Sequence, residues 1–134
     1  MTKPENLKGV FAAALTPLNA DLSVDNERLV SHSTWLLKNG CDGLAVLGTT
    51  GEANSFSVAE RIGILETLSE AGIPGSVLMP GTGCCSITDT VELTRCAVEL
   101  GAGGVLMLPP FYYKNVSDDG LFAAYSEVIE QVGD

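Results

Sequence analysis

The sequence predicts an α/β protein with a parallel sheet, and three observations lead to this prediction. Four apolar runs recur roughly every 30 residues, at residues 10–17, 43–48, 76–80 and 104–110, and a segment with helical periodicity follows each one. The runs are continuously apolar, as in strands covered on both faces. The unusual glycine-rich and aromatic motifs all follow the carboxyl ends of the runs. Two architectures fit: a doubly wound open sheet, or half of a (β/α)8 barrel.

The first run leads into a helix predicted over about residues 24–38, with Ser23 as its N-cap. Gly40 follows the last helical position and ends it. The apolar positions expected on the inward side of this helix are Leu29, Val30, Trp35 and Leu36.

The other three runs lead into helices with serine or threonine caps. The second helix is predicted to end near residue 72, the third to end at residue 101, and the fourth to continue nearly to the end of the chain. Their expected caps are Ser57, in a capping box with Glu60, then Ser86 or Thr88, and finally Ser117.

Composition and charge narrow the possible functions. The chain has 134 residues, 46% of them hydrophobic and 18% charged, which suits one globular domain with a sizeable core. Seventeen acidic residues against seven basic ones give a net charge of −10, so nucleic acid and anionic membranes are not expected as partners. No apolar segment reaches the roughly 18 residues that span a bilayer, and no signal sequence precedes Gly9. The expected location is cytoplasmic.

Cysteine and histidine are too few and too scattered for a metal centre. The four cysteines form no CxxC pair, and the single histidine, His32, falls within the first predicted helix. Half-buried reduced thiols and no metal are therefore expected. The cysteines are Cys41, Cys84, Cys85 and Cys96.

The motifs favour the barrel over a dinucleotide-binding sheet. The GTGCCS stretch at residues 81–86 lacks the third glycine of a dinucleotide fingerprint. By contrast, a barrel presents its site from the loops at the carboxyl ends of its strands, where this chain has GTTGE (48–52), PGTG (80–83) and PPFYY (109–113). A full barrel takes about 250 residues. Residues 1–134 are therefore interpreted as a single unit, the N-terminal half of one.

The turn GTTGE is the strongest candidate site. Gly48 and Gly51 allow a tight turn and a close approach of the backbone to a ligand, and Thr49 and Thr50 add hydroxyl and N–H donors. These features suit a carboxylate. The alternative is an ordinary strand-to-helix turn whose threonines cap the next helix.

Together these motifs resemble the N-terminal half of the dihydrodipicolinate synthase and N-acetylneuraminate lyase family of Schiff-base aldolases. The resemblance covers nearly the whole chain, through GVFAAALTPL, GCDGLAVLGTTGEANSFSVAER, PGTG and LPPFYY in order. It implies a (β/α)8 enzyme, usually a tetramer, that holds pyruvate or another 2-oxo acid as a lysine imine and needs no other cofactor.

By position, the resemblance implies that Thr49, Thr50 and Gly51 bind the substrate carboxylate. It also implies that Thr49 and Tyr112 are catalytic, as members of a hydroxyl relay in which Tyr112 reaches into the neighbouring subunit. The family's second relay tyrosine and its imine lysine belong to strands five and six, which correspond to positions after residue 134. Among the lysines of this chain only Lys114 lies near the expected active face, and its loop position favours a solvated side chain.

Several functions remain open within this resemblance. Polar residues typical of lysine-inhibited synthases are replaced here by Val58, Cys84, Thr88 and Phe111, so a sugar-acid aldolase or dehydratase fits as well as a biosynthetic synthase. Two further alternatives are a non-catalytic carboxylate-binding module and a unit that self-assembles through its open sheet edges.

Overall fold

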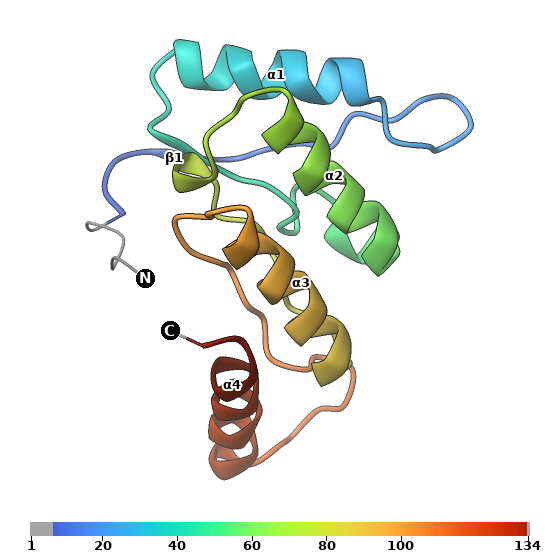
Figure 1. Ribbon diagram of the computed structural model, residues 1–134. Helices are drawn as coiled ribbons and strands as arrows, with labels where there is room; N and C mark the ends of the chain where they lie inside the picture. The colour runs from blue at the N-terminus through green and yellow to red at the C-terminus, as the bar shows by residue number, and fades with distance from the viewer. Residues whose placement is uncertain (1–6, 134) are drawn as a thin grey trace.

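The computed structural model describes residues 7–133, in which four long helices follow four extended segments (Figure 1). The strands are β1 (Phe11–Ala13) and β2 (Gly43–Ala45), which pair in parallel with Phe11 opposite Gly43. The α-helices are α1 (Asn26–Lys38), α2 (Val58–Glu70), α3 (Ile87–Glu99) and α4 (Asp118–Val132). Two short 3₁₀ turns, η1 (Ala53–Ser55) and η2 (Gly75–Val77), precede α2 and the third extended segment.

The third and fourth apolar runs are not continuous strands, so the expected strands at 76–80 and 104–110 are wrong in extent. Each makes one isolated parallel bridge instead, Leu78 with Leu44 and Leu106 with Gly81. Part of the reason is local: η2 occupies the start of the third run, and Pro80 has no N–H to donate to a ladder.

The four segments nevertheless lie side by side in chain order. The N–H of Met79 donates to the carbonyl of Leu44 at 2.9 Å, and the N–H of Gly81 donates to that of Val46 at 2.8 Å. On the other side of the third segment, the N–H of Leu106 donates to the carbonyl of Pro80 at 2.9 Å. The predicted parallel layer of four βα units is therefore present, with short strands.

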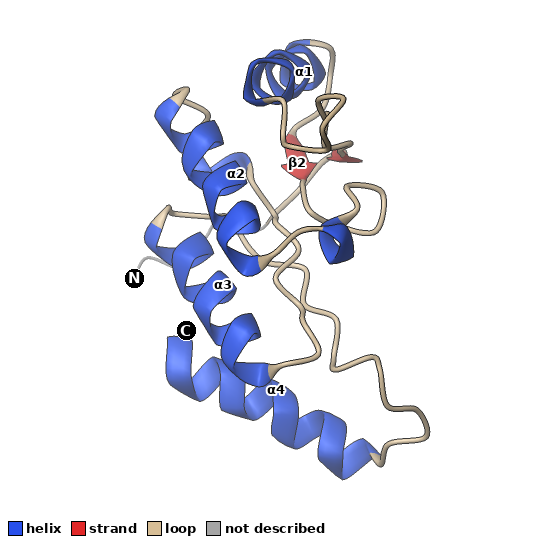
Figure 2. Cartoon of the chain, turned by 90° about the vertical axis from the view of Figure 1, so that its right-hand side faces the viewer, coloured by secondary structure: helices blue, strands red, loops and turns tan. Residues whose placement is uncertain are grey.

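All four helices lie on one side of this layer. In Figure 2 they form an arc around β2 and the segments that follow it, and each long helix contacts the next one along the chain. A doubly wound sheet carries helices on both faces, whereas a barrel keeps them on the outside. The arrangement is that of a half barrel, which confirms the predicted fold class.

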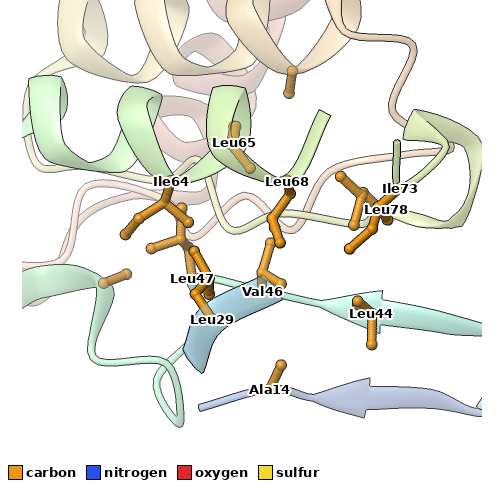
Figure 3. Packing of buried hydrophobic residues seen from close by; sticks show 12 residues of the cluster. Ala14, Leu29, Leu44, Val46, Leu47, Ile64, Leu65, Leu68, Ile73 and Leu78 are labelled. Carbon is orange, nitrogen blue, oxygen red and sulfur yellow. The ribbon is translucent and has the colours of Figure 1, made fainter. Parts of the chain in front are cut away.

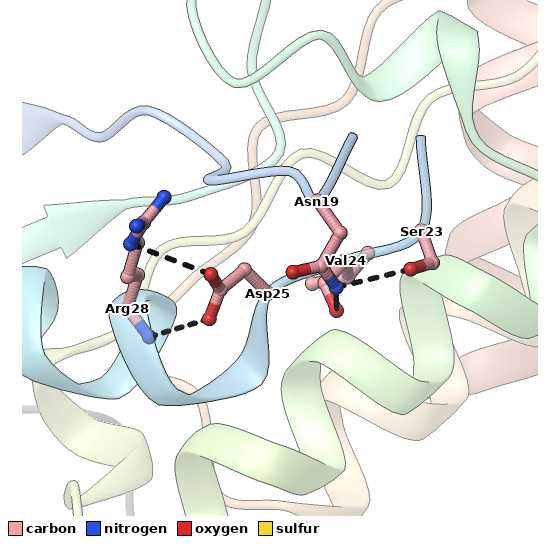
Figure 4. A network of polar contacts seen from close by, with 5 residues as sticks. All are labelled: Asn19, Ser23, Val24, Asp25 and Arg28. Carbon is pink, nitrogen blue, oxygen red and sulfur yellow. Dashed lines mark hydrogen bonds and ion pairs between the residues drawn. The ribbon is translucent and has the colours of Figure 1, made fainter. Parts of the chain in front are cut away.

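The N-cap of α1 is Asp25, and the expected cap Ser23 is wrong. The carboxylate of Asp25 accepts a hydrogen bond from the N–H of Arg28 at 2.9 Å and forms an ion pair with the same residue at 3.4 Å (Figure 4). The hydroxyl of Ser23 lies in a preceding loop, donates to Asp21 at 2.6 Å and accepts from Asn19 at 3.0 Å. An antiparallel bridge between Leu18 and Val24 closes that loop and keeps Val24 outside the helix, which begins at Asn26.

The other predicted caps are confirmed. Ser57 and Glu60 form the expected capping box at the start of α2. Ser86 caps α3 by accepting from the N–H of Asp89, and Ser117 caps α4 by accepting from that of Gly120.

The core lies between β2 and the inner faces of α1 and α2 (Figure 3). Leu44 and Leu47 from the second segment meet Leu29 of α1 and Leu68 of α2, and all four are at most 1% exposed. The expected inward position of Trp35 is wrong, because its side chain is 59% exposed. At 100° per residue, Trp35 points well away from Leu29, while Ser33 falls on the same face and is fully buried.

Candidate functional site

A cavity of about 490 Å³ opens at the carboxyl ends of the second, third and fourth segments. This is the end at which a barrel places its site. Its lining residues are Leu47, Gly48, Thr49, Glu52, Ala53, Asn54, Ser55, Arg61, Gly81, Gly83, Leu106, Met107 and Leu108.

The turn at residues 48–51, here called the carboxylate turn, is held in shape from both ends. Leu47 and Glu52 flank it with φ of 57° and 55°, left-handed values that reverse the chain within a few residues. The hydroxyl of Thr16, which is buried, donates to the carbonyl of Gly51 at 2.8 Å. Gly51 is buried too, and an added Cβ there would lie 3.0 Å from the carbonyl oxygen of Ala14.

The donors of the carboxylate turn are unused within the described part of the chain. Among the hydrogen bonds of residues 7–133, none involves the N–H groups of Thr49, Thr50 or Gly51, or either threonine hydroxyl. Both threonines are exposed. Thr49 lines the cavity, whereas Thr50 and Gly51 lie outside its lining. The turn therefore has several unpaired donors among residues 7–133, and Thr49 is the threonine of the turn that lines the cavity.

The third segment packs closely against the carboxylate turn. A Cβ on Gly81 would overlap the carbonyl oxygen of Leu47 and come within 3.3 Å of the N–H nitrogen of Gly48. Only glycine allows this approach of two backbones. The PGTG motif thus supports the turn from beside it.

Arg61 is a site residue that the sequence reasoning missed. Its side chain is 3% exposed, lines the cavity, and donates to the carbonyl of Gly81 at 2.7 Å and to the sulfur of Cys84 at 3.1 Å. A signal was available, because residues 61, 64, 65 and 68 share one face of α2 and the other three are core residues. An arginine on a buried helical face indicates a specific partner for its guanidinium.

The cysteines are free thiols. Cys41, Cys84 and Cys96 are partly buried, as expected, but Cys85 is exposed. Burial raises the pKa of the Cys84 thiol, and the neighbouring Arg61 only partly offsets this effect. Burial likewise raises the pKa of Cys96.

Tyr112 projects from the loop at residues 109–113, here called the tyrosine loop. Its side chain is 74% exposed, and its ring packs edge-on against that of Tyr113 with centroids 5.2 Å apart. No hydrogen bond joins Tyr112 to Thr49 within residues 7–133, so the structure does not bring the two proposed relay residues together. Tyr125, on α4, fixes this helix to the fourth segment by donating to the carbonyl of Met107 at 3.0 Å.

None of the described lysines is placed to form an imine in the cavity. Lys114 is exposed and its ammonium donates to the carbonyl of Phe111 at 2.6 Å. Lys8 and Lys38 are exposed and do not line the cavity, and Lys3 lies outside the described residues. His32 is partly buried on α1, in a surface groove beside Trp35.

Two structural features are absent from residues 7–133. No helix there is long and apolar enough to cross a membrane. The same residues contain no cluster of three or more His, Cys, Asp or Glu side chains that could hold a metal ion.

Comparison with known proteins gives consistent matches along the chain. The model of the Dihydrodipicolinate synthetase family matches residues 6–134. An uncharacterized DapA-like lyase of Chloroflexus aurantiacus is 42% identical over 88% of this chain, and 4-hydroxy-tetrahydrodipicolinate synthase of Coxiella burnetii is 34% identical over 92%. This chain covers only 40% and 43% of those two proteins.

Solved structures also match nearly the whole of this chain, which covers less than half of each of theirs. Dihydrodipicolinate synthase from Agrobacterium tumefaciens superposes with a TM-score of 0.90 and 41% identity, over 94% of this chain and 44% of that one. N-acetylneuraminate lyase from Proteus mirabilis gives 0.84 and 34%, over 94% and 43%. Dihydrodipicolinate synthase from Acinetobacter baumannii, solved with pyruvate, gives 0.84 and 31%, over 95% and 43%.

Proposed function

The chain belongs to the dihydrodipicolinate synthetase family of lyases and aldolases, and on that premise we propose that it supplies the carboxylate-binding part of a 2-oxo-acid lyase. Residues 1–134 act in this proposal as the N-terminal half of a barrel. Thr49, Thr50 and Gly51 bind the carboxylate of pyruvate or a related acid.

One observation carries the proposal: the donors of the carboxylate turn are unpaired among residues 7–133 while the turn itself is rigidly supported. Thr16 fixes Gly51, and Gly81 packs against Leu47, so the N–H groups do not need to reorganise when an anion arrives. The Acinetobacter relative was solved in complex with pyruvate, which supports pyruvate as the small acid in this proposal.

The covalent step is proposed to use a lysine outside this chain. A primary amine attacks the ketone carbon of the acid, water leaves after proton transfer, and the resulting imine accepts electrons from the adjacent carbon. Thr49 and Tyr112 are proposed to carry protons in that step. Because Tyr112 is exposed and not bonded to Thr49 here, its proposed place is the site of a neighbouring subunit.

A titration of the ¹⁵N-labelled chain with pyruvate tests the binding role. We expect saturable shifts of the Thr49, Thr50 and Gly51 amides, and loss of saturation in Thr50→Ala. Thr67→Ala on α2 is the control and keeps the response. Absence of any saturable shift at the three amides contradicts the proposal.

Reduction with borohydride in the presence of pyruvate tests the covalent step separately. We expect no mass adduct on this chain alone, because its described lysines are solvated or distant from the cavity. An adduct mapped to Lys114 would refute the assignment of the lysine elsewhere.

A second candidate function is self-assembly through the two open edges of the layer. Beside the first segment, Leu15 is 57% and Trp35 is 59% exposed, and along the fourth segment and α4, Leu108 is 54% and Phe122 is 76% exposed. In a pair of half barrels related by a twofold axis, the first segment of each copy would pair with the fourth segment of the other. Both apolar patches would then be covered. Sedimentation equilibrium that shows only monomer at micromolar concentration would exclude this candidate.

A further inference from the structure

The guanidinium of Arg61 is a buried charge without a counter-ion in the described chain. It donates to one carbonyl and one thiol sulfur, and its Nε–H has no partner. Within residues 7–133 the ion pair found is that of Arg28 with Asp25, on the surface of α1. Burying a cation is costly unless an anion or a full set of acceptors compensates it.

Cys84 does not provide the missing negative charge. Burial raises the pKa of this thiol above its ordinary value, so it is neutral near pH 7 and accepts the Arg61 hydrogen bond through uncharged sulfur. The other charged residue that lines the cavity, Glu52, is exposed and makes no ion pair with Arg61. The positive charge of Arg61 is thus uncompensated in the cavity wall.

The position of this charge relates it to the carboxylate turn. The guanidinium holds the carbonyl of Gly81 at 2.7 Å, and the Gly81 backbone packs on Leu47 and Gly48, where the turn begins. Arg61 is the cationic residue in the cavity lining, in a chain whose net charge is −10. An anion that enters against this overall charge needs a local positive field.

We propose that Arg61 is a positioning residue whose buried guanidinium supplies the positive field for an anionic 2-oxo acid and clamps residues 81–84 against the carboxylate turn. Because the side chain is buried, it acts on the acid through its field and through the turn, without touching it. This inference rests on the proposed binding of a carboxylate at residues 49–51.

The test compares an anionic ligand with its neutral ester in variants that keep or remove the positive charge of Arg61. Dissociation constants for pyruvate and for methyl pyruvate are measured by NMR with the unmodified chain, Arg61→Lys, Arg61→Gln and Arg61→Met. Arg95→Gln on α3, where the exposed guanidinium donates to Gln131, is the control for the change in net charge.

We expect Arg61→Gln to weaken pyruvate binding by about tenfold, because the anion loses the attraction of a poorly screened unit charge, and to change methyl pyruvate binding by less than about twofold. Arg61→Lys keeps most of the pyruvate affinity. Arg95→Gln leaves both constants within about twofold, because an exposed charge is screened. Arg61→Met provides a second uncharged side chain of similar length if the glutamine variant does not fold.

The outcomes separate this inference from the proposed function. If Arg61→Gln weakens the binding of both ligands equally, Arg61 acts only by holding residues 81–84 in place. That result would overturn the proposed electrostatic effect. Unchanged pyruvate binding in Arg61→Gln overturns the inference and leaves the proposed function intact. If the unmodified chain binds no pyruvate, both fall.

A second readout needs no ligand. The pH dependence of Cys84 alkylation is expected to move to higher pH in Arg61→Gln, because Arg61 stabilises the thiolate. An unchanged profile means that the charge does not act at this site, and it overturns the inference whatever pyruvate does.

Discussion

The carboxylate turn and the tyrosine loop occupy equivalent places in two βα units, and they differ in how the chain holds them. The turn is fixed by Thr16 and by the close approach of Gly81. In the tyrosine loop, Tyr112 and Tyr113 are 74% and 78% exposed, and their rings pack edge-on against each other. The geometry of the turn is therefore set by contacts among residues 7–133, while the two tyrosine side chains are largely exposed.

The largest expected effect breaks the support of the turn. Gly81→Ala places a methyl group onto the carbonyl oxygen of Leu47, so we expect the free energy of unfolding to fall by about 3 kcal/mol. Urea denaturation measures this loss. Gly63→Ala, in α2 with open space around its Cβ, is the control and is expected to gain up to about 1 kcal/mol. Equal stability of Gly81→Ala and the unmodified chain would show that the two backbones are not in contact.

A smaller effect is expected when the Thr16 hydroxyl is removed. Thr16→Val leaves the buried carbonyl of Gly51 without its donor and should cost about 1–2 kcal/mol in unfolding free energy. Thr16→Ser keeps the donor and serves as the control. The ¹⁵N order parameters of residues 49–51 should fall in the valine variant, and if they stay the same the turn is rigid for another reason.

The helix that follows the turn should show a modest pH dependence. Hydrogen bonds from the N–H and hydroxyl of Ser57 lower the pKa of Glu60 below its ordinary value. The contribution of Glu60 to stability is therefore present above the ordinary glutamate pKa and is lost as the pH falls through the lowered value. Glu60→Gln should flatten the dependence of stability on pH in this acidic range, measured by thermal unfolding. Glu66→Gln, on the exposed face of α2, should leave the curve as it is.

The smallest effect is expected in the tyrosine loop. Tyr112→Phe should change the free energy of unfolding by less than about 0.5 kcal/mol, because its hydroxyl has no partner among residues 7–133. Tyr125→Phe is the contrast: it removes a hydrogen bond to Met107 and should cost about 1 kcal/mol. A destabilising Tyr112→Phe would mean that the loop is as well held as the turn.

Local signals predicted the helices well because capping and periodicity act over a few residues. Ser57, Ser86 and Ser117 cap as expected, since each serine stands directly before a helical pattern. The cap of α1 was misplaced by two residues because the bridge between Leu18 and Val24 joins positions that no local rule connects.

The local shape of the candidate site was predictable in part for the same reason. The glycines that allow a tight turn and the threonines that add hydroxyl donors are adjacent in the sequence, at residues 48–51. The support from Thr16 and the burial of Arg61 depend on contacts with Gly51 and Gly81, which are distant in the chain. Periodicity alone could have placed Arg61 on the inward face of α2, but its acceptors are visible only in three dimensions.

The chain-order pairing of the four segments has a consequence for how the protein emerges from the ribosome. Leu44 pairs with Leu78 and Gly81 with Leu106, so within residues 7–133 each extended segment finds its partner in the unit synthesised just before it. Folding can then advance from the N-terminus at the pace of synthesis, because loop closure never spans more than one βα unit. The carboxylate turn is completed when the third segment arrives, before the tyrosine loop is made.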